Sequence, residues 1–249
     1  MGKKKKIQTL IDESIVVKES PFSEGEVAAP RKPKVCYKIK LKCKNAKQKE
    51  YAKMIDEKEI VFATGSAGCG KTYVAVLKAL ELLKEDNKFE KIYLITSSLP
   101  SEENLGLLPG NVDEKLLPSM MSFLIVIDEI IGRVERERLF KENLIEFMPI
   151  SYLRGVNLKN CIILADEMQN LTIRGMKTLL TRLAANSVAI ISGDVEQIDN
   201  PKLNKNNSGL TYIIDKVKAK PDDRIGIIEF GEEHVVRNPI INVLLEYFE

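Results

Sequence analysis

The stretch GSAGCGKT, Gly65 to Thr72, decides the fold of this chain of 249 residues. It matches the pattern G-x-x-x-x-G-K-[ST] at every position. The apolar run IVFAT precedes it, and TYVAVLKALELLK, with apolar residues at helical spacing, follows it. A strand, a glycine-rich turn and a helix in this order are the context in which the pattern binds phosphate. We therefore predict a phosphate-binding loop between a strand and a helix.

Each residue type in this loop has its own chemistry. Gly65, Gly68 and Gly70 let the backbone curl so that its N–H groups face an anion, and the helix N-terminus adds its dipole. Lys71 is expected to reach the β- and γ-phosphates of a nucleotide, and Thr72 to offer its hydroxyl to Mg²⁺. The residues expected to contact the nucleotide in this stretch are Gly65, Ser66, Ala67, Gly68, Cys69, Gly70, Lys71, Thr72 and Tyr73.

Strand and helix patterns alternate along the rest of the chain. Helices are predicted at NAKQKEYAKMIDEKE and LTIRGMKTLLTRL, with a long helical region over about 113–141. Alternation of this kind predicts an α/β fold, with a mostly parallel sheet and helices on both faces. In KPKVCYKIKLKCK, apolar residues alternate with lysines, which predicts a half-buried strand with a basic outer face. The other strand-like runs are KIYLIT, LIEFMPI, CIILAD, VAIISGD and IGIIEF.

Two stretches compete for the role of Walker B strand, which must place an aspartate beside the Mg²⁺ of the phosphate loop. FLIVIDEI, residues 123–130, has no turn on either side, and its apolar residues continue at steps of three or four, which predicts a helix. CIILADEMQN, residues 161–170, is a short apolar run that ends in an acidic pair before a polar segment. We therefore assign the role to the second stretch, and expect its strand to neighbour the strand of the loop.

This assignment gives the acidic residues their expected roles. Asp166 is predicted to hold Mg²⁺ together with Thr72, and Glu167 to orient and polarise the attacking water. Gln169 after the acidic pair, together with Asp194 and Gln197 of GDVEQ, suggests a sensor of the γ-phosphate.

The first part of the chain differs in charge from the rest. Residues 1–50 hold 14 Lys or Arg against 6 Asp or Glu, a balance of +8 in a chain of net charge +2. We predict a flexible basic arm over 1–33, with either nucleic acid or solvent alone as its contact, and an ATPase domain over 34–249. No run reaches the ~18 apolar residues of a membrane span, and the four cysteines have no metal-binding spacing. A cytoplasmic location without a membrane partner is expected.

The motifs together resemble the PhoH family, relatives of superfamily 1 helicases, over roughly residues 45–249. This resemblance implies a RecA-like P-loop NTPase fold, ATP as the nucleotide, and a ring or other homo-oligomer, with a hexamer favoured. It also implies that Gln48 reads the adenine edge and that Tyr51 packs nearby. The segments that match are QKEYAKMI, GSAGCGKT, NLGLLPGN, SYLRG, LADEMQN, KTLLTRL, GDVEQIDNP, SGL and VVRNP.

The chain departs from the usual family sequence at one point, and the choice of a catalytic arginine stays open. Members of the family usually have Arg-Pro where this chain has Ser97 and Ser98, so a phosphate contact of nucleic acid is expected to be weaker here. An oligomeric ATPase often uses an arginine from a neighbouring subunit. Arg154, Arg182 and Arg237 fall in family-like motifs, and Arg182 and Arg237 are the preferred catalytic pair, although each could instead form structural ion pairs.

The sequence thus predicts an ATPase, with ATP and Mg²⁺ as cofactors and Lys71, Asp166, Glu167, Gln197, Arg182 and Arg237 as catalytic residues. Coupling to RNA or single-stranded DNA, as in a helicase or translocase, is expected from the resemblance. The alternative is a nucleotide-dependent binding or regulatory switch that moves nothing. A small-molecule kinase is disfavoured by the Glu-x-Gln and Gly-Asp-x-x-Gln motifs.

Overall fold

A computed structural model describes residues 37–39, 42–97, 112–236 and 247, with side chains from residue 120 onward in the helix that begins at 112. The predicted arm, residues 1–33, lies outside the described residues. The helices are α2 (Ala46–Glu57), α3 (Lys71–Glu85), α5 (Val112–Ile131), α6 (Arg133–Lys141), α7 (Ile173–Leu180) and α8 (Gly209–Ala219), with short 3-10 turns η1 (Ile150–Leu153), η2 (Met168–Asn170) and η3 (Glu232–His234). The strands are β1 (Ile60–Gly65), β2 (Lys91–Thr96), β3 (Ile145–Phe147), β4 (Cys161–Asp166), β5 (Val188–Gly193) and β6 (Ile225–Phe230).

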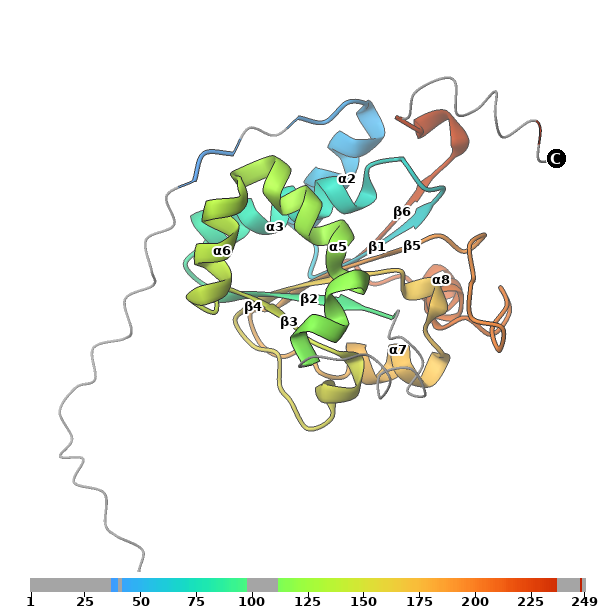
Figure 1. The fold of residues 1–249 in the computed structure, drawn as a ribbon. Helices are drawn as coiled ribbons and strands as arrows, with labels where there is room; N and C mark the ends of the chain where they lie inside the picture. The colour runs from blue at the N-terminus through green and yellow to red at the C-terminus, as the bar shows by residue number, and fades with distance from the viewer. Residues whose placement is uncertain (1–36, 40–41, 98–111, 237–246, 248–249) are drawn as a thin grey trace, which may run out of the picture. The chain divides into compact units, whose positions relative to one another are not determined.

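The six strands form one parallel sheet in the order β3-β2-β4-β5-β1-β6. Every residue of the central strands β4 and β5 is buried, which explains their unbroken apolar runs. Helices α2, α3, α5 and α6 cover one face of the sheet, and α7 and α8 cover the other (Figure 1). The predicted α/β fold, with a parallel sheet and helices on both faces, is confirmed.

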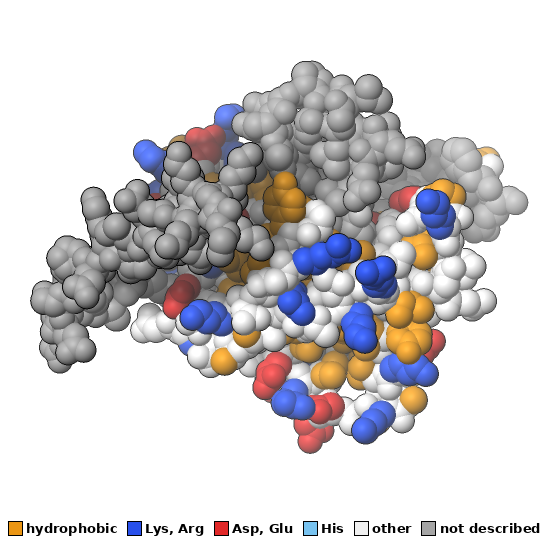
Figure 2. Space-filling model, turned by 90° about the horizontal axis from the view of Figure 1, so that it is seen from below, with side chains coloured by type: hydrophobic (Ala, Val, Ile, Leu, Met, Phe, Trp, Pro, Cys, Tyr) orange, Lys and Arg blue, Asp and Glu red, His pale blue; other side chains and the backbone are white. Residues whose placement is uncertain are grey.

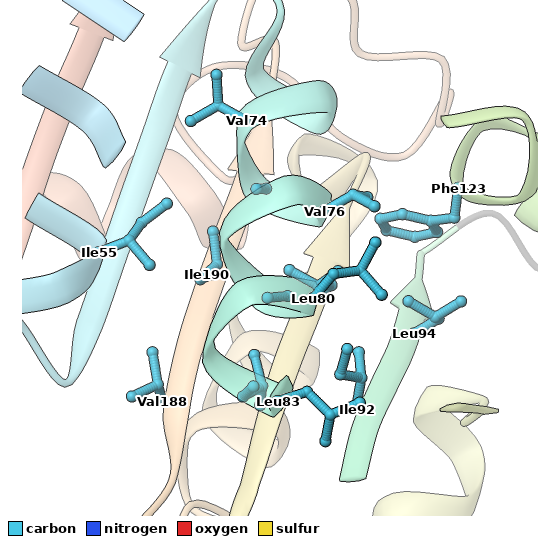
Figure 3. Packing of buried hydrophobic residues seen from close by; sticks show 14 of the residues in the cluster. Ile55, Val74, Val76, Leu80, Leu83, Ile92, Leu94, Phe123, Val188 and Ile190 are labelled. Atoms are coloured by element: carbon cyan, nitrogen blue, oxygen red, sulfur yellow. The ribbon is translucent and has the colours of Figure 1, made fainter. Parts of the chain in front are cut away.

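Each face of the sheet has its own hydrophobic core. On the α3 side, Val76 and Leu80 of the helix pack onto Ile92, Leu94 and neighbouring strand residues, all of them buried (Figure 3). On the other side, the apolar residues of α7 and α8 pack against the sheet through Met176, Leu179, Leu210, Ile214 and Val217. Helices cover both faces of the sheet. The edge at which the parallel strands end is therefore left open to form a site.

The stretch FLIVIDEI lies in helix α5, as predicted. Phe123, Leu124 and Ile127 are buried, whereas the Asp128 carboxylate pairs with Arg136 at 2.6 Å. The helical region over about 113–141 is two helices rather than one, because Gly132 between α5 and α6 has φ +82°. That backbone conformation is open to glycine and cannot continue a right-handed helix.

The strand predicted over KPKVCYKIKLKCK is wrong for the residues described there, 37–39 and 42–44, which form no strand. The Tyr37 hydroxyl donates to the carbonyl of Leu80 at 2.6 Å, and the Lys84 ammonium donates to the carbonyl of Tyr37 at 2.8 Å. Tyr37 therefore lies against helix α3. Among the described residues, Tyr37 is buried and Ile39 and Cys43 are partly buried, whereas the lysines are exposed, so the period of two reflects burial without a strand.

No helix in the described ranges is long and apolar enough to cross a membrane.

Candidate nucleotide-binding site

The glycines of the phosphate loop adopt a backbone that other residues rarely adopt. Strand β1 ends at Gly65 with φ +131°, and Gly70 precedes helix α3 with φ +80°. A Cβ on Gly65 would lie 2.1 Å from the carbonyl oxygen of Phe230, and one on Gly70 would lie 2.6 Å from Nε2 of Gln48. The loop thus requires glycine for its curl and for the close approach of β6 and α2.

We expect Gly65→Ala to destabilise the chain far more than Gly132→Ala. Both glycines have positive φ outside the left-handed helical region, which costs an alanine about 1–3 kcal/mol. A Cβ at Gly132 meets no atom within 4 Å, whereas one at Gly65 must displace the backbone of β6. The free energy of unfolding in urea should fall by about 2 kcal/mol for Gly132→Ala and by more than ~4 kcal/mol for Gly65→Ala. Equal losses would show that the close approach of β6 is unimportant.

A cavity of about 290 Å³ lies at the loop and gathers many of the predicted residues. Its lining is Ala67, Gly68, Gly70, Lys71, Thr72, Tyr73, Val126, Asp166, Glu167, Gly193, Asp194 and Gln197. The buried Lys71 ammonium donates to the carbonyls of Gly65 and Ser66 at 2.6 and 2.9 Å. Cys69 is buried outside this lining. A larger cavity of about 630 Å³, at Ile55–Ile60 and Leu183–Val188, lies at the opposite end of the strands and contains none of the predicted site residues.

Asp166 faces the loop from the last position of β4. One of its carboxylate oxygens accepts from the Thr72 hydroxyl at 2.7 Å, and the other accepts from the Ser192 hydroxyl at 2.7 Å. The expectation that β4 would neighbour β1 is wrong, because β5 lies between them. Thr72 spans the gap since it stands on the first turn of α3, which packs over both β4 and β5.

The residues at this point fit a magnesium ion. Mg²⁺ prefers oxygen ligands, and it is usually bound by one or two carboxylates together with the phosphates of a substrate. The Thr72 hydroxyl and the Asp166 carboxylate are such ligands, they already lie within hydrogen-bond distance of each other, and both line the cavity.

Glu167 has an unusual backbone and a shifted carboxyl group. Its φ of +59° is rare for a residue with a side chain, and it turns the chain sharply after β4. Burial raises the pKa of its carboxyl group above the usual value, and the Asp166 carboxylate adds to this effect. The hydrogen bond from Gln169 lowers this pKa, and so does the positive charge of Lys71. The Glu167 carboxylate is therefore partly desolvated, although the side chain reaches solvent.

Gln169 is wholly buried and connects the ends of two strands. Its Nε2 donates to the Glu167 carboxylate at 2.7 Å and to the carbonyl of Gln197 at 3.0 Å. Its Oε1 accepts from the backbone N–H of Asp194 at 3.1 Å. The Ser208 hydroxyl donates to its carbonyl at 2.8 Å. The three residues suggested as a sensor are thus brought together, with Gln169 in the middle.

Asp194 and Gln197 take part in this network mainly through their backbones. The Asp194 carboxylate accepts from the N–H of Glu196 at 3.0 Å within its own turn. The side chain of Gln197 is exposed at the edge of the cavity. The predicted catalytic role of Gln197 stays a prediction.

Gln48 of helix α2 holds the phosphate loop by a hydrogen bond. Its Nε2 donates to the carbonyl of Cys69 at 2.8 Å, and its Oε1 accepts from the N–H of Lys44 at 2.7 Å. Tyr51 is wholly buried with its ring edge-on to Phe230, so it presents no face to a ligand. A structural role for Gln48 is therefore visible, and its reading of adenine stays a prediction.

Sequence reasoning missed the part that Ser97 plays in the site. This residue directly follows β2, where Thr96 pairs in register with Asp166. Its hydroxyl donates to the carbonyl of Glu167. From the sequence, Ser97 is expected only to mark the loss of a cation. The signal that could have revealed it was its position at the end of a strand next to β4.

The two predicted arginines that the structure describes, Arg154 and Arg182, do not line this cavity. Arg182 lies six residues before β5, at the end of the sheet opposite the loop, and its Nε is buried without a hydrogen-bond partner among the described residues. Arg154 is exposed after η1. Arg237 lies outside the described residues, although the N–H of Val236 before it donates to the carbonyl of Gly68 at 3.0 Å. A role in a neighbouring subunit stays a prediction for both preferred arginines.

Comparison with known proteins agrees with the motifs. Residues 40–249 match the family described as PhoH-like protein. The chain is 38% identical over 209 residues to a PhoH-like protein of Bacillus subtilis, covering 84% of this chain and 64% of the relative. It is 34% identical over 199 residues to Protein PhoH of Escherichia coli K12, covering 79% and 55%.

The extent of the match differs between this chain and its relatives. The chain spans between 55% and 64% of the length of these two proteins. Among solved structures, a Pif1 helicase from Candida albicans has a TM-score of 0.40 at 17% identity, covering 83% of this chain and 44% of the other, which is too low to add to the fold described above. Because the family match covers residues 40–249, well over half of the sequence, the chain belongs to the PhoH-like protein family.

Proposed function

We propose that this chain is a Mg²⁺-dependent ATPase that is coupled to RNA or single-stranded DNA and works as a homo-oligomer. The observation that supports the ATPase best is the convergence of Lys71, Thr72, Asp166 and Glu167 on one cavity. These residues come from the end of strand β4 and the start of helix α3, far apart in the sequence. Their side chains supply a cation, a hydroxyl and two carboxylates, the set that phosphoryl transfer to water needs.

The chain's residues have separate tasks in this proposal. The N–H groups of the loop and the Lys71 ammonium bind the β- and γ-phosphates. Thr72 and Asp166 hold Mg²⁺, which supplies charge neutralisation on the phosphates when bound. The Glu167 carboxylate, held by Gln169, orients a water for in-line attack on the γ-phosphate, and ADP and inorganic phosphate result. Arg182 or Arg237 of a neighbouring subunit stabilises the transferring charge.

The test is ATP hydrolysis with and without single-stranded RNA or DNA, followed by a strand-separation assay. We expect Mg²⁺-dependent turnover that nucleic acid stimulates, and removal of Mg²⁺ with EDTA should abolish it. Turnover that proceeds equally well in EDTA would contradict the metal-dependent mechanism. Strand separation would support a helicase, and stimulation without separation would support a translocase.

A nucleotide-dependent switch is the second candidate, and the Gln169 network favours it. Gln169 joins the turn that carries Glu167 to the turn after β5 and to Ser208 at the start of α8. A change at the γ-phosphate could thus move elements outside the cavity without any motor activity. Slow hydrolysis that nucleic acid does not stimulate, combined with nucleotide-dependent binding of a partner, would favour the switch.

We expect Ser97→Ala to lower kcat about fivefold while the KM for ATP stays near the parental value. The lost hydrogen bond supports the carbonyl of Glu167, and one such bond contributes about 1 kcal/mol. Ser97→Thr retains the hydroxyl and should restore kcat. Steady-state kinetics of the three proteins measure this. A changed KM with unchanged kcat would show that Ser97 does not act through Glu167.

A further inference from the structure

The outer sides of η1, α7 and α8 form a surface with an excess of positive charge. The segments 148–160 and 171–187 hold five Lys or Arg and no Asp or Glu, whereas 30 residues of this chain hold about four carboxylates on average, from 36 in 249. Helix α7 packs between η1 and α8. Figure 2 shows this side of the molecule, with Lys and Arg side chains across its middle and most Asp and Glu side chains toward its edge. We call it the cationic face: Tyr152, Arg154, Ile173, Arg174, Lys177, Tyr212 and Lys216.

The arginines of the cationic face differ from most other arginines that the structure describes. On α6 and before β6, Arg133, Arg136, Arg138 and Arg224 each pair with a carboxylate. Arg154 and Arg174 are exposed and pair with none of the described carboxylates, and the same is true of Lys177. Asp215 is the one carboxylate within η1, α7 and α8. An exposed row of cations without internal partners matches an external polyanion in charge.

Aromatic side chains lie among these cations. The exposed fractions of Tyr152 and Tyr212 are 56% and 41%, large for tyrosine, and Ile173 at 38% stands beside Arg174. The Lys216 ammonium lies 5.3 Å from the centre of the Tyr212 ring. Cations that follow a phosphate backbone and aromatic rings on which bases stack are the two parts of a sequence-tolerant single-strand site. An acidic peptide would need the cations but not the exposed rings.

The cationic face is also connected to the nucleotide site. Helix α7 starts three residues after η2, the turn that contains Gln169. Helix α8 starts directly after Ser208, whose hydroxyl donates to the carbonyl of Gln169, and the N–H of Gly209 donates to the carbonyl of Leu171 at 2.7 Å. Both helices of the face thus begin at the turn that holds Glu167.

From these observations we infer that the cationic face binds single-stranded nucleic acid. Phosphates contact Arg154, Arg174 and Lys177, and bases stack on Tyr152 and Tyr212. The cationic face would be the surface through which nucleic acid is coupled to ATP hydrolysis. Only this coupling rests on the proposed function. Binding itself can be measured without ATP.

The experiment measures the affinity of the full chain for a fluorescent 20-nucleotide oligouridylate, and for its deoxythymidine counterpart, by anisotropy at several salt concentrations. Arg174→Gln with Lys177→Gln should weaken binding about tenfold, and should reduce the slope of log Kd against log salt by about 1.4, since each phosphate contact of a single strand contributes about 0.7. Tyr152→Leu with Tyr212→Leu should weaken binding at least about fivefold. Lys53→Gln with Lys141→Gln is the matched control, because it removes two exposed lysines from α2 and α6 on the other side of the sheet.

The outcomes separate the inference from the ATPase proposal. Basal ATP turnover should stay parental in the Arg174 and Lys177 variant, while stimulation by oligouridylate should fall. Equal losses in that variant and in the control, or no binding by the parent, would overturn the inference. A changed sedimentation coefficient with unchanged affinity would also overturn it and would mark the face as a contact between subunits. If the parent binds oligouridylate through this face but hydrolyses no ATP, only the ATPase proposal fails.

Discussion

Glu167→Gln is expected to lower the rate of ATP hydrolysis by about 10²–10⁴-fold while ATP still binds. Gln169 donates to the Glu167 carboxylate at 2.7 Å, and the amide oxygen of a glutamine can accept the same bond, so the geometry should persist. The amide cannot accept a proton from water or polarise it as a carboxylate does. Single-turnover hydrolysis and binding of a fluorescent ATP analogue, measured on the same preparation, check the two parts of this expectation. A variant that turns over at the parental rate would exclude Glu167 as the residue that orients the water.

The same substitution should not weaken the fold. Burial raises the pKa of the Glu167 carboxyl group in the folded chain, so its ionised form is disfavoured there relative to the unfolded chain. Any stability that Glu167 contributes is therefore present at low pH and is lost as the pH rises through its raised pKa. At neutral pH, without nucleotide or Mg²⁺, we expect Glu167→Gln to unfold at an equal or higher urea concentration than the parent. A large loss of stability would indicate that the inactivity has a structural cause.

The local patterns of the sequence predicted the fold because each element has a consistent period. Strands β4 and β5 are buried along their whole length, and their unbroken apolar runs follow from that. The distinction between the helix at Phe123 and the strand at Cys161 also held, since a helical stripe continues past the acidic pair in one case and stops in the other. The strand predicted around residues 37–39 and 42–44 is wrong, because alternating burial is not specific to strands. A period of two reports which side chains are buried, and does not report whether a strand or a helix covers them.

What local pattern could not show is the pairing of elements that are distant in the sequence. The position of β5 between β1 and β4 depends on the connections of the whole sheet. The hydrogen bond from Ser97 to the carbonyl of Glu167 follows from the register of β2 on β4, and the central place of Gln169 follows from two turns that meet only in the fold. The cationic face likewise combines three segments of unremarkable sequence, around η1, α7 and α8, that lie side by side only once the chain is folded.

Asp166→Asn should abolish ATP turnover, whereas Asp128→Asn should leave it within about twofold of the parent. Both aspartates follow a run of branched apolar residues and precede a glutamate, so the local sequences are alike. Asp166 accepts from Thr72 at 2.7 Å and lines the cavity, and replacing one carboxylate oxygen by an NH₂ group removes a magnesium ligand. The Asp128 carboxylate instead pairs with Arg136 between α5 and α6, a partly exposed pair that contributes about 1 kcal/mol or less.

The two variants should also differ in how they respond to Mg²⁺ and to urea. Asp166→Asn should need far more Mg²⁺ for any residual turnover, because the remaining protein ligand is the Thr72 hydroxyl, and its unfolding midpoint should change little. Asp128→Asn should show the parental Mg²⁺ dependence with a slightly lower midpoint. Turnover measured across a Mg²⁺ titration distinguishes them. The reverse result, with Asp128→Asn inactive and Asp166→Asn active, would move the metal site to α5 and would require α5 to contact the phosphates in place of β4.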